Sequence, residues 1–413
     1  MSSAGQFYRF ASVALLGGVR TPWVDLNGDF AALSPTDMGI KAGRAVLQHC
    51  DVGADQVDSV LAGSMAQAAF DAYMLPRHIG LYCGVAQQVP ALMVQRICAT
   101  GFELLRQAGQ QVEAGEARMA LCVAAESMSR NPIAAYNHRG GFRLGTEVGF
   151  KDFLWEALFD PAAGISMIET AENLAQEHGI TRSEVDAWAA QSFQRALSAR
   201  EQGWFAGECI EVGNETFEVA GLRPRQIQLP RGVERICQDS HPRSTSPELL
   251  ARLAPVYPGG VQTAGNSCAV VDGAAAMLVC HGDGLQGCAP LAWLRASSVV
   301  GVAPHLMGIG PVPAIQLLLE RSGLGLEDIS HFEINEAQGA QILAVQRVLG
   351  IDPDRLNPQG GAIALGHPLA ATGLRLATTL ARQLRASGQR YAVAAACVGG
   401  GQGMALLLEN PDA

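Results

Sequence analysis

The sequence predicts a layered α/β protein made of two similar halves. Of its 413 residues, 48% are hydrophobic and 16% are charged, which is enough apolar side chains for a large buried core. Short runs that are apolar on both faces alternate with segments of helical periodicity, and this alternation is typical of a sheet covered by helices on both sides. An internal repeat adds the second half.

The repeat lies at a constant offset of 272 residues. Residues 99–102 (ATGF) align with 371–374 (ATGL), and the apolar run 119–125 (MALCVAA) aligns with 391–397 (YAVAAAC). Several matches in one register indicate an internal duplication, with each copy reading as helix, strand, loop, helix, strand. Two such copies predict pseudo-two-fold symmetry.

The expected elements follow in chain order. The N-terminal stretch MSSAGQFYRFASVALLGG is broken by Gly17 and Gly18 and has no clear cleavage site, so we expect a first strand rather than a signal peptide. Apolar spacing predicts helices over 99–115, 181–201 and 372–387, with the strands 119–125 and 391–398 after the first and the third.

The two copies differ in length after their second strand. The first continues for more than 120 residues before a counterpart of the closing strand appears, which predicts an insertion. We therefore expect an N-terminal half made of 1–127 and 248–283, an inserted loop domain over 128–247, and a C-terminal half over 284–413.

Composition excludes several classes of partner. The formal net charge is −10, so a basic nucleic-acid surface is not expected, and no uninterrupted apolar stretch of about 18 residues predicts a membrane span. The ten cysteines form no CxxC pair and no cluster with histidine at zinc spacing, so we expect no metal site and no disulfide framework. Reduced thiols favour a cytoplasmic location.

Two reactive residues stand at equivalent junctions of the copies. Cys98 precedes the 99–115 helix, whose N-terminus favours a thiolate, although a buried inert cysteine is the ordinary alternative. His367 lies in NPQGGAIALGHPLAATG before the 372–387 helix, where a backbone-bonded loop histidine is the alternative. The duplication predicts that these junctions meet near the symmetry axis.

Two further segments carry candidate groups. Cys397 precedes a glycine run, 399–403, whose N–H groups could face an oxyanion or simply form a tight turn. Asn335 and Glu336 follow an expected strand, and the repeat predicts that they face the same side of the sheet as the other candidate groups. The alternative is that they are an ordinary polar strand end.

Together these motifs are similar to those of a known family. The chain resembles the thiolases (acyl-CoA:acetyl-CoA C-acyltransferases) over essentially its whole length, and its layout is similar to the mitochondrial-type 3-ketoacyl-CoA members. The motifs are QRICATGF, AAESMS, TAENLA, TAGN, DGAAA, NEA, GGAIALGHP and CVGGGQG, with DAYMLPRHIGLYCGV and MGIGPVPAI supporting the layout.

The resemblance implies a duplicated thiolase-like α/β/α/β/α layered sandwich with an inserted loop domain. It implies that Cys98 is the acylated nucleophile, that His367 activates it, and that Cys397 shuttles the proton at the α-carbon of a second acyl-CoA. Asn335, through a water, and His367 would line one oxyanion hole, and the N–H groups of Cys98 and Gly399 the other. Coenzyme A and acyl-CoA are then substrates, no cofactor is bound permanently, and a homodimer or homotetramer is expected.

Three positions that would contact substrate depart from the family pattern. Gln338 replaces an aromatic residue, Cys268 replaces a serine that contacts coenzyme A, and Ser166 stands where acetoacetyl-specific members carry a histidine before methionine. The resemblance implies that Met167, Cys268 and Gln338 are the residues that contact the substrate. We hypothesise that Gln338 selects a functionalised or bulky acyl group; the alternative is that its side chain points away from the pocket.

Two other functions are weighed against a thiolase-type acyltransferase. A non-catalytic acyl-CoA-binding or scaffold subunit is disfavoured because all the expected catalytic groups are present. A decarboxylating ketoacyl synthase is disfavoured because its site would not contain the second cysteine, Cys397.

Overall fold

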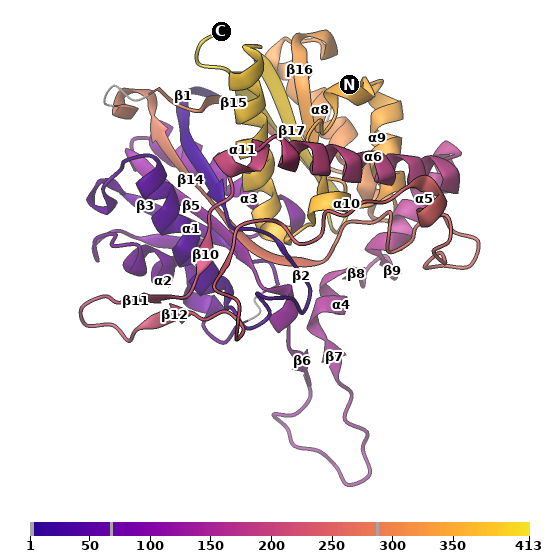
Figure 1. Cartoon of the computed structure of the whole chain (residues 1–413), viewed down its shortest axis with the longest axis horizontal. Coiled ribbons are helices and arrows are strands. Elements are labelled where there is room, and N and C mark those ends of the chain that lie inside the picture. The colour runs from indigo at the N-terminus through magenta and orange to yellow at the C-terminus, as the bar shows by residue number, and fades with distance from the viewer. Residues whose placement is uncertain (1–3, 67–68, 286–288) are drawn as a thin grey trace.

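The computed structural model describes residues 4–66, 69–285 and 289–413, and most of its strands join one mixed sheet (Figure 1). The strand order is β16-β17-β18-β15-β1-β14-β5-β3-β4, and β2 pairs with β14 off this path. The bounds are β1 (Gln6–Arg20), β2 (Val24–Asp25), β3 (Ser59–Gly63), β4 (Ala91–Met93), β5 (Met119–Glu126), β14 (Val271–His281), β15 (Ala292–Gly301), β16 (Ile329–Ile334), β17 (Tyr391–Val398) and β18 (Gln402–Glu409).

The sheet order repeats the duplication found in the sequence. The run β3-β5-β14-β1 is mirrored by β16-β17-β18-β15, with the two halves joined where β1 pairs antiparallel with β15. In each half one pair is parallel, β3 with β5 and β16 with β17. β5 and β17 also begin 272 residues apart, at Met119 and Tyr391.

Helices lie between and outside the two halves of the sheet. The central pair, α3 (Thr100–Glu113) and α11 (Leu369–Ser387), contact each other and strands of both halves. On the outside, α1 (Pro35–His49) and α2 (Leu75–Tyr82) cover the N-terminal half, and α8 (Pro311–Ser322), with α9 (Gly339–Leu349) beside it, covers the C-terminal half. The predicted layered α/β sandwich is therefore confirmed, as are the first strand (from Gln6; residues 1–3 lie outside the described part) and the predicted helices.

Two equivalent glycines mark the pseudo-symmetry axis. A Cβ on Gly101 would lie 2.5 Å from the backbone N of Leu374, and one on Gly373 would lie 2.6 Å from the backbone N of Phe102. Only glycine permits this approach of two helix backbones. The first turns of α3 and α11 consequently lie together, and so do the segments that lead into them.

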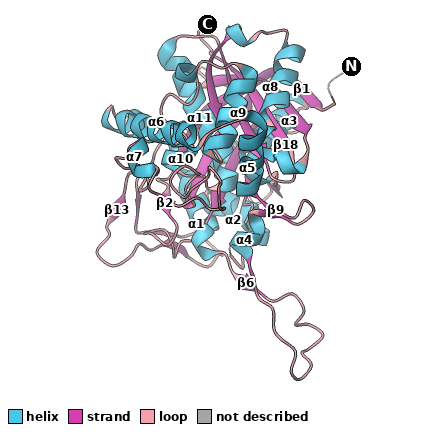
Figure 2. Cartoon of the chain, turned by 90° about the vertical axis from the view of Figure 1, so that its right-hand side faces the viewer, coloured by secondary structure: helices cyan, strands magenta, loops and turns pink. Residues whose placement is uncertain are grey.

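Residues 128–247 contribute no strand to the large sheet. They form short ribbons and two long helices, α5 (Met167–His178) and α6 (Arg182–Glu201), the latter at the predicted place. The chain between β6 (Ile133–Ala134) and β7 (Lys151–Asp152) extends away from the body as an arm (Figures 1 and 2). Other elements of this region are α4 (Phe153–Ala157), β8 (Phe159–Asp160), β9 (Ile165–Ser166), β10 (Val212–Gly213), β11 (Glu215–Phe217), β12 (Arg225–Ile227) and β13 (Arg235–Ile236).

Two short helices complete the chain, α7 (Pro247–Leu250) and α10 (Ala362–Leu365). No helix within the described ranges is long and apolar enough to cross a membrane.

Candidate active site

Cys98 lies in a tight turn at the N-terminus of α3. The turn spans Ile97–Ala99, and the hydroxyl of Thr100 holds it by accepting from the backbone N–H of Arg96 (2.9 Å) and donating to the carbonyl of Ile97 (2.7 Å). Ile97 has φ 47°, a left-handed conformation that is strained for a β-branched residue. The surrounding hydrogen bonds thus hold Cys98 in one orientation.

The surroundings of Cys98 favour the neutral thiol. The backbone N–H groups of Gly399 and Cys98 itself lower its pKa, as expected at a helix N-terminus, but desolvation is the larger effect and raises the pKa to about 11. The helix terminus and desolvation thus act in opposite directions on the Cys98 pKa, and only the first of these effects is visible from the position of Cys98 in the sequence.

His367 is fixed by three contacts. Its backbone N–H donates to the carbonyl of Ala269 (3.0 Å), and its ring Nδ1 lies 2.6 Å from the hydroxyl of Thr372. Its Nε2 lies 3.3 Å from the side-chain Nδ2 of Asn335. An amide Nδ2 can only donate, so Nε2 is the accepting nitrogen and Nδ1 carries the proton toward Thr372. Burial, aided by Arg375, lowers the His367 pKa to about 3, which keeps the ring neutral.

Asn335 and Glu336 are neighbours in sequence with different surroundings. Asn335 is fully buried, and its Oδ1 has no hydrogen-bond partner among the described residues. Glu336 instead accepts hydrogen bonds from Trp188 Nε1 (3.1 Å) and Ser192 Oγ (2.7 Å), which lie on α6. Asn335 therefore belongs to the reactive group, whereas Glu336 anchors α6 to the C-terminal half.

Cys397 lies near the C-terminal end of β17, one residue before Val398. It is 1% exposed and packs with Met307, Ala337 and Met167. Burial and the negative charge of ionised Cys98 raise its pKa well above the ordinary thiol value, and Cys268 acts in the same direction. The three thiols are thus close enough to influence one another electrostatically.

The glycine run after Cys397 forms the turn between β17 and β18. Gly400 and Gly401 have φ of 80° and 85°, which favours glycine. A Cβ on Gly399 would lie 3.4 Å from a side-chain carbon of Ile97. This turn brings the Gly399 N–H to the Cys98 sulfur, a place where a donor could stabilise an oxyanion.

A small cavity, which we call the inner cavity, opens beside these groups. It has a volume of about 110 Å³ and is lined by His367 together with the three predicted substrate-contacting residues Met167, Cys268 and Gln338. Its other lining residues are Met128, Trp155, Leu158, Ser166, Ile168, Ser267, Ala269, Val270 and Leu369.

A second space, the outer cavity, lies on the other side of Met167, which lines both. It has a volume of about 410 Å³, and its walls include Ile97 and Gly399. Its aromatic side chains come from the region 128–247: Tyr136, Phe153 and Phe159. Ile97, next to Cys98 in the sequence, lines the outer cavity, and Cys268, whose pKa is raised by the charge of ionised Cys98, lines the inner one.

Glu126 joins the two halves of the protein by hydrogen bonds to backbone groups of both. Its carboxylate accepts hydrogen bonds from the backbone N–H groups of Met65, Ala66 (3.2 Å) and Ala370 (3.3 Å). Burial raises its pKa to about 7, and its charge raises the pKa of Cys98.

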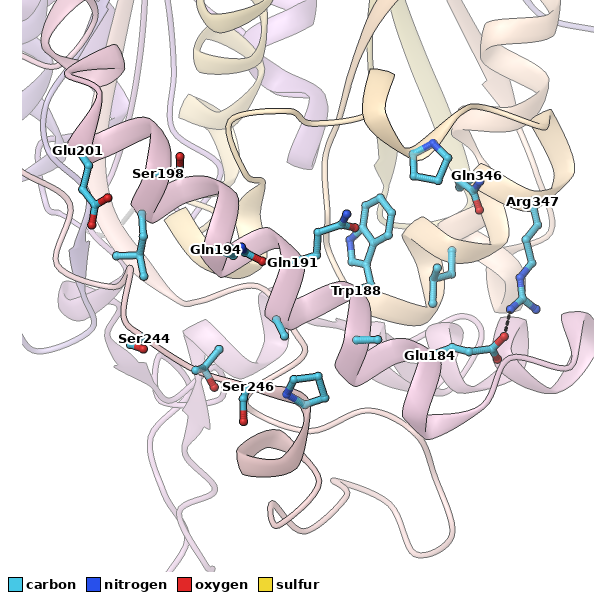
Figure 3. A pocket seen from close by; sticks show the side chains of 17 residues that line it. Glu184, Trp188, Gln191, Gln194, Ser198, Glu201, Ser244, Ser246, Gln346 and Arg347 are labelled. Atoms are coloured by element: carbon cyan, nitrogen blue, oxygen red, sulfur yellow. Dashed lines mark hydrogen bonds and ion pairs between the residues drawn. The ribbon is translucent and has the colours of Figure 1, made fainter.

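A larger groove lies elsewhere, along α6 (Figure 3). It has a volume of about 1010 Å³ and runs along α6, between the segment 244–247 and α9. Glu184 and Arg347 form an ion pair of 2.5 Å at one end. No predicted site residue lines this groove, so size alone does not identify the reactive centre.

Some site residues could not be found from sequence motifs. Trp155 and Leu158 lie in the arm-bearing region, where neither spacing nor periodicity marks them. Thr372, whose hydroxyl contacts His367, lies in the repeated ATG segment. That repeat is the feature of the sequence that points to this residue. Within the described ranges, no group of three or more His, Cys, Asp or Glu side chains is arranged to hold a metal ion.

Comparison with known proteins identifies relatives along the whole chain. Residues 13–283 match the family described as "Thiolase, N-terminal domain" and 288–410 match "Thiolase, C-terminal domain". The mitochondrial 3-ketoacyl-CoA thiolase of Bos taurus is 40% identical over 96% of this chain and 100% of its own length. The β-ketoadipyl-CoA thiolase of Acinetobacter baylyi is 36% identical over 96% and 98%.

Solved structures agree with this. The human mitochondrial 3-ketoacyl-CoA thiolase in complex with CoA superposes with a TM-score of 0.92 at 37% identity, covering 99% of this chain and 100% of that one. These names also correct the expected cytoplasmic location, since the cattle and human relatives are named as mitochondrial. Reduced thiols describe the redox state of a compartment and do not distinguish one reducing compartment from another.

Proposed function

This chain belongs to the thiolase family, and from that premise we propose that its acyltransferase reaction runs through a thioester on Cys98. The enzyme cleaves 3-ketoacyl-CoA with CoA or, in reverse, condenses acyl-CoAs. The assignment of roles is supported by two pairs of neighbours, Asn335 with His367 (3.3 Å) and Cys98 with Cys397, and by Cys268, which influences the Cys397 pKa and lines the inner cavity with His367. The non-catalytic alternative gains no support from the comparisons.

In the first half-reaction, the sulfur of Cys98 attacks the thioester carbonyl of an acyl-CoA. The thiol proton moves to Nε2 of His367, and the CoA thiolate leaves and takes up that proton. Because burial lowers the His367 pKa to about 3, the protonated ring is short-lived and readily returns its proton to the leaving group. The N–H groups of Cys98 and Gly399 are placed to stabilise the oxyanion formed on the way.

In the second half-reaction, Cys397 passes its thiol proton to Nε2 of His367, and the resulting thiolate removes a proton from the α-carbon of a second acyl-CoA. The carbanion attacks the carbonyl carbon of acyl-Cys98, the carbon–sulfur bond breaks, and the Cys98 sulfur takes the proton from Nε2 of His367. A thiolate with a raised pKa is a stronger base, which suits a weakly acidic C–H. Asn335 and His367 would stabilise the enolate oxygen from the inner-cavity side.

The substrate would extend from the outer cavity past Met167 into the inner cavity. Its acyl group would lie there beside Cys268 and Gln338. CoA binding is supported by the human relative, whose structure is a complex with CoA. We treat coenzyme A as a substrate and propose no permanently bound cofactor.

Trapping experiments separate the two cysteines. Cys397→Ala, incubated with acetyl-CoA, should still accumulate an acetyl group on Cys98 but lose about 10²–10⁴-fold in condensation rate. Cys98→Ala should not be acetylated at all. Cys122→Ala, a buried thiol that donates to the Leu104 carbonyl, is the matched control and should retain activity. Equal failure of the Cys397 variant in both half-reactions would contradict these roles.

We also propose the division into an N-terminal half (1–127 and 248–283), an inserted loop domain (128–247) and a C-terminal half (284–413). It is supported by the mirrored sheet order and by the absence of 128–247 from the large sheet among the described residues.

We propose that the protein is a homodimer or a dimer of dimers. Two exposed apolar surfaces support self-association. One lies beside the edge strand β4, where Phe70 and Tyr73 are 88% and 80% exposed and Leu92 is also exposed. The other is the arm, with Ile133, Tyr136, Phe142, Leu144 and Phe150. Sedimentation should give at least twice the 43.4 kDa chain mass, and an active monomer would contradict the proposal.

A further inference from the structure

Gln338 is held rigidly at the wall of the inner cavity. It precedes α9, and its backbone pairs with Ser267 as an antiparallel bridge. On either side, the N–H of Cys268 donates to the Ala337 carbonyl (3.1 Å) and the N–H of Gly339 to the Asn266 carbonyl (2.9 Å). This pairing fixes the backbone of Gln338 at the cavity wall, which the side chain lines.

The amide of Gln338 is buried without a complete set of partners. The residue is 5% exposed, and its Oε1 has no hydrogen-bond partner among the residues that the structure describes. Leaving such an acceptor unpaired costs about 1–3 kcal/mol. A buried acceptor that faces a cavity is satisfied when a ligand brings a donor to it.

The rest of the wall restricts which ligand that can be. Most of it is apolar: Met128, Trp155, Leu158, Ile168, Val270 and Leu369. The hydroxyl of Ser166 is already paired with Tyr257 Oη at 2.7 Å. No lysine or arginine is among the lining residues, and His367 is neutral because burial lowers its pKa to about 3. A carboxylate placed there would therefore lack a counter-charge.

We propose that Gln338 determines acyl specificity by accepting a hydrogen bond from a hydroxyl group on a short acyl chain. This inference rests on the proposed function, since it places the acyl group of acyl-Cys98 in the inner cavity. The inner cavity volume of about 110 Å³ is several times the roughly 10–15 Å³ that one water molecule requires on the same measure, which leaves room for a few heavy atoms. A short hydroxyacyl group fits the cavity volume and also donates a hydrogen bond to the unpaired Oε1 of Gln338. A plain alkyl chain of the same length fits the volume but leaves Oε1 unpaired.

Thiolysis of three matched substrates tests the proposal. They are 3-ketohexanoyl-CoA, its 6-hydroxy derivative and 3-ketoadipyl-CoA, which deliver acyl groups of similar length ending in methyl, hydroxymethyl and carboxylate. We expect kcat/KM of the unmodified enzyme to be about tenfold higher for the hydroxylated substrate than for the plain one, the value of one hydrogen bond. The carboxylated substrate should be the poorest.

Gln338→Met keeps the length of the side chain and removes the amide. This variant should have a lower kcat/KM for the hydroxylated substrate and a higher kcat/KM for the plain one, which reverses the preference. In Gln338→Glu the uncharged wall favours the protonated carboxyl group, whose carbonyl oxygen is still an acceptor, so this variant should keep the hydroxyl preference. Gln194→Met, at an exposed position on α6, is the matched control and should leave the ratio unchanged.

Equal kcat/KM for the plain and hydroxylated substrates in the unmodified enzyme would overturn the proposal, even if the variants failed to fold. A preference for 3-ketoadipyl-CoA would overturn it as well. Acetylation of Cys98 by acetyl-CoA, followed by mass spectrometry, is measured alongside. If Cys98 is acylated while the ratio does not depend on Gln338, only the specificity proposal fails; if Cys98 is never acylated, the proposed function fails too.

Discussion

The resting state of Cys98, the proposed nucleophile, is decided by two opposing effects on its pKa. N–H groups near Cys98 favour its thiolate, while the protein that surrounds the sulfur removes solvent and disfavours it. Desolvation is the stronger effect. The site therefore differs from those in which a cysteine and a histidine rest as an ion pair, and its neutral pair ionises only as substrate reacts.

This balance predicts the pH dependence of Cys98 alkylation. With a pKa of about 11, the thiolate fraction should rise about tenfold for each pH unit between 7 and 10, and the rate of iodoacetamide labelling should follow. Peptide-level mass spectrometry distinguishes Cys98 from the exposed Cys237. A labelling rate that is already constant above pH 7 would indicate a resting Cys98–His367 ion pair and contradict the prediction.

The residues themselves divide into those that sequence identifies and those that it cannot. Cys98, His367, Asn335 and Cys397 stand in dense motifs at repeat junctions, so sequence placed them together. The sign of the Cys98 pKa shift and the wall formed by Trp155 depend on burial and on the path of the 128–247 region. Burial and the path of this region depend on the tertiary fold. The local periodicity of the sequence therefore does not predict them.

At the scale of elements, the contact of α3 with α11 fixes the site. The backbones meet at Gly101 and Gly373, whose added Cβ atoms would lie within 3.0 Å of backbone atoms. Backbone cannot move aside as a flexible side chain can. The duplication predicted that the two junctions meet, whereas the need for glycine at the crossing is visible only in the structure.

Gly101→Ala should therefore separate the helices and lower the free energy of unfolding by about 1–3 kcal/mol. Activity should fall as well, since Cys98 and His367 precede the two helices. Urea denaturation measures the first effect. Gln110→Ala on the same helix is a control at a partly exposed position and should change little. A fully stable Gly101→Ala protein would show that the crossing tolerates a side chain.

A buried ion network joins the region 128–247 to the halves. Arg20 of β1 donates to Glu208 (2.9 Å) and Asp239 (2.6 Å), and Glu208 also accepts from Thr379 (2.9 Å) and Arg382 (3.2 Å) on α11. Arg20 and Glu208 are each 1% exposed. Removing one partner of such a network leaves the other charges buried and uncompensated.

Glu208→Ala is consequently expected to reduce the free energy of unfolding by about 3–5 kcal/mol. Glu211→Ala, three residues away, removes an exposed partner of Arg235 and should cost less than about 1 kcal/mol. Denaturant unfolding of the two variants side by side gives the comparison. Similar losses in both would mean that burial of the network contributes little to attaching this region.

At the scale of the whole molecule, the buried side chain of His367 makes stability depend on pH. Its folded pKa of about 3 lies below the unfolded value of about 6.5, so below pH 6.5 the unfolded chain binds more protons than the folded one. The stabilising contribution is complete above pH 6.5 and is lost as the pH falls toward 3. Raised pKa values at Glu126 and Glu333, each about 7, act in the opposite direction, because the folded state then holds the extra proton between pH 4.5 and 7.

A variant isolates the histidine contribution from these carboxyl groups. His367→Gln retains a polar side chain of similar size but cannot take up a proton, while Glu126 and Glu333 remain in both proteins. Between pH 7 and pH 5 the unmodified enzyme should lose about 1–2 kcal/mol more of its free energy of unfolding than the variant does. Urea denaturation at a series of pH values measures this difference. Parallel loss of stability in the two proteins would mean that His367 takes up its proton equally in the folded and unfolded states, and the neutral buried imidazole would have to be abandoned.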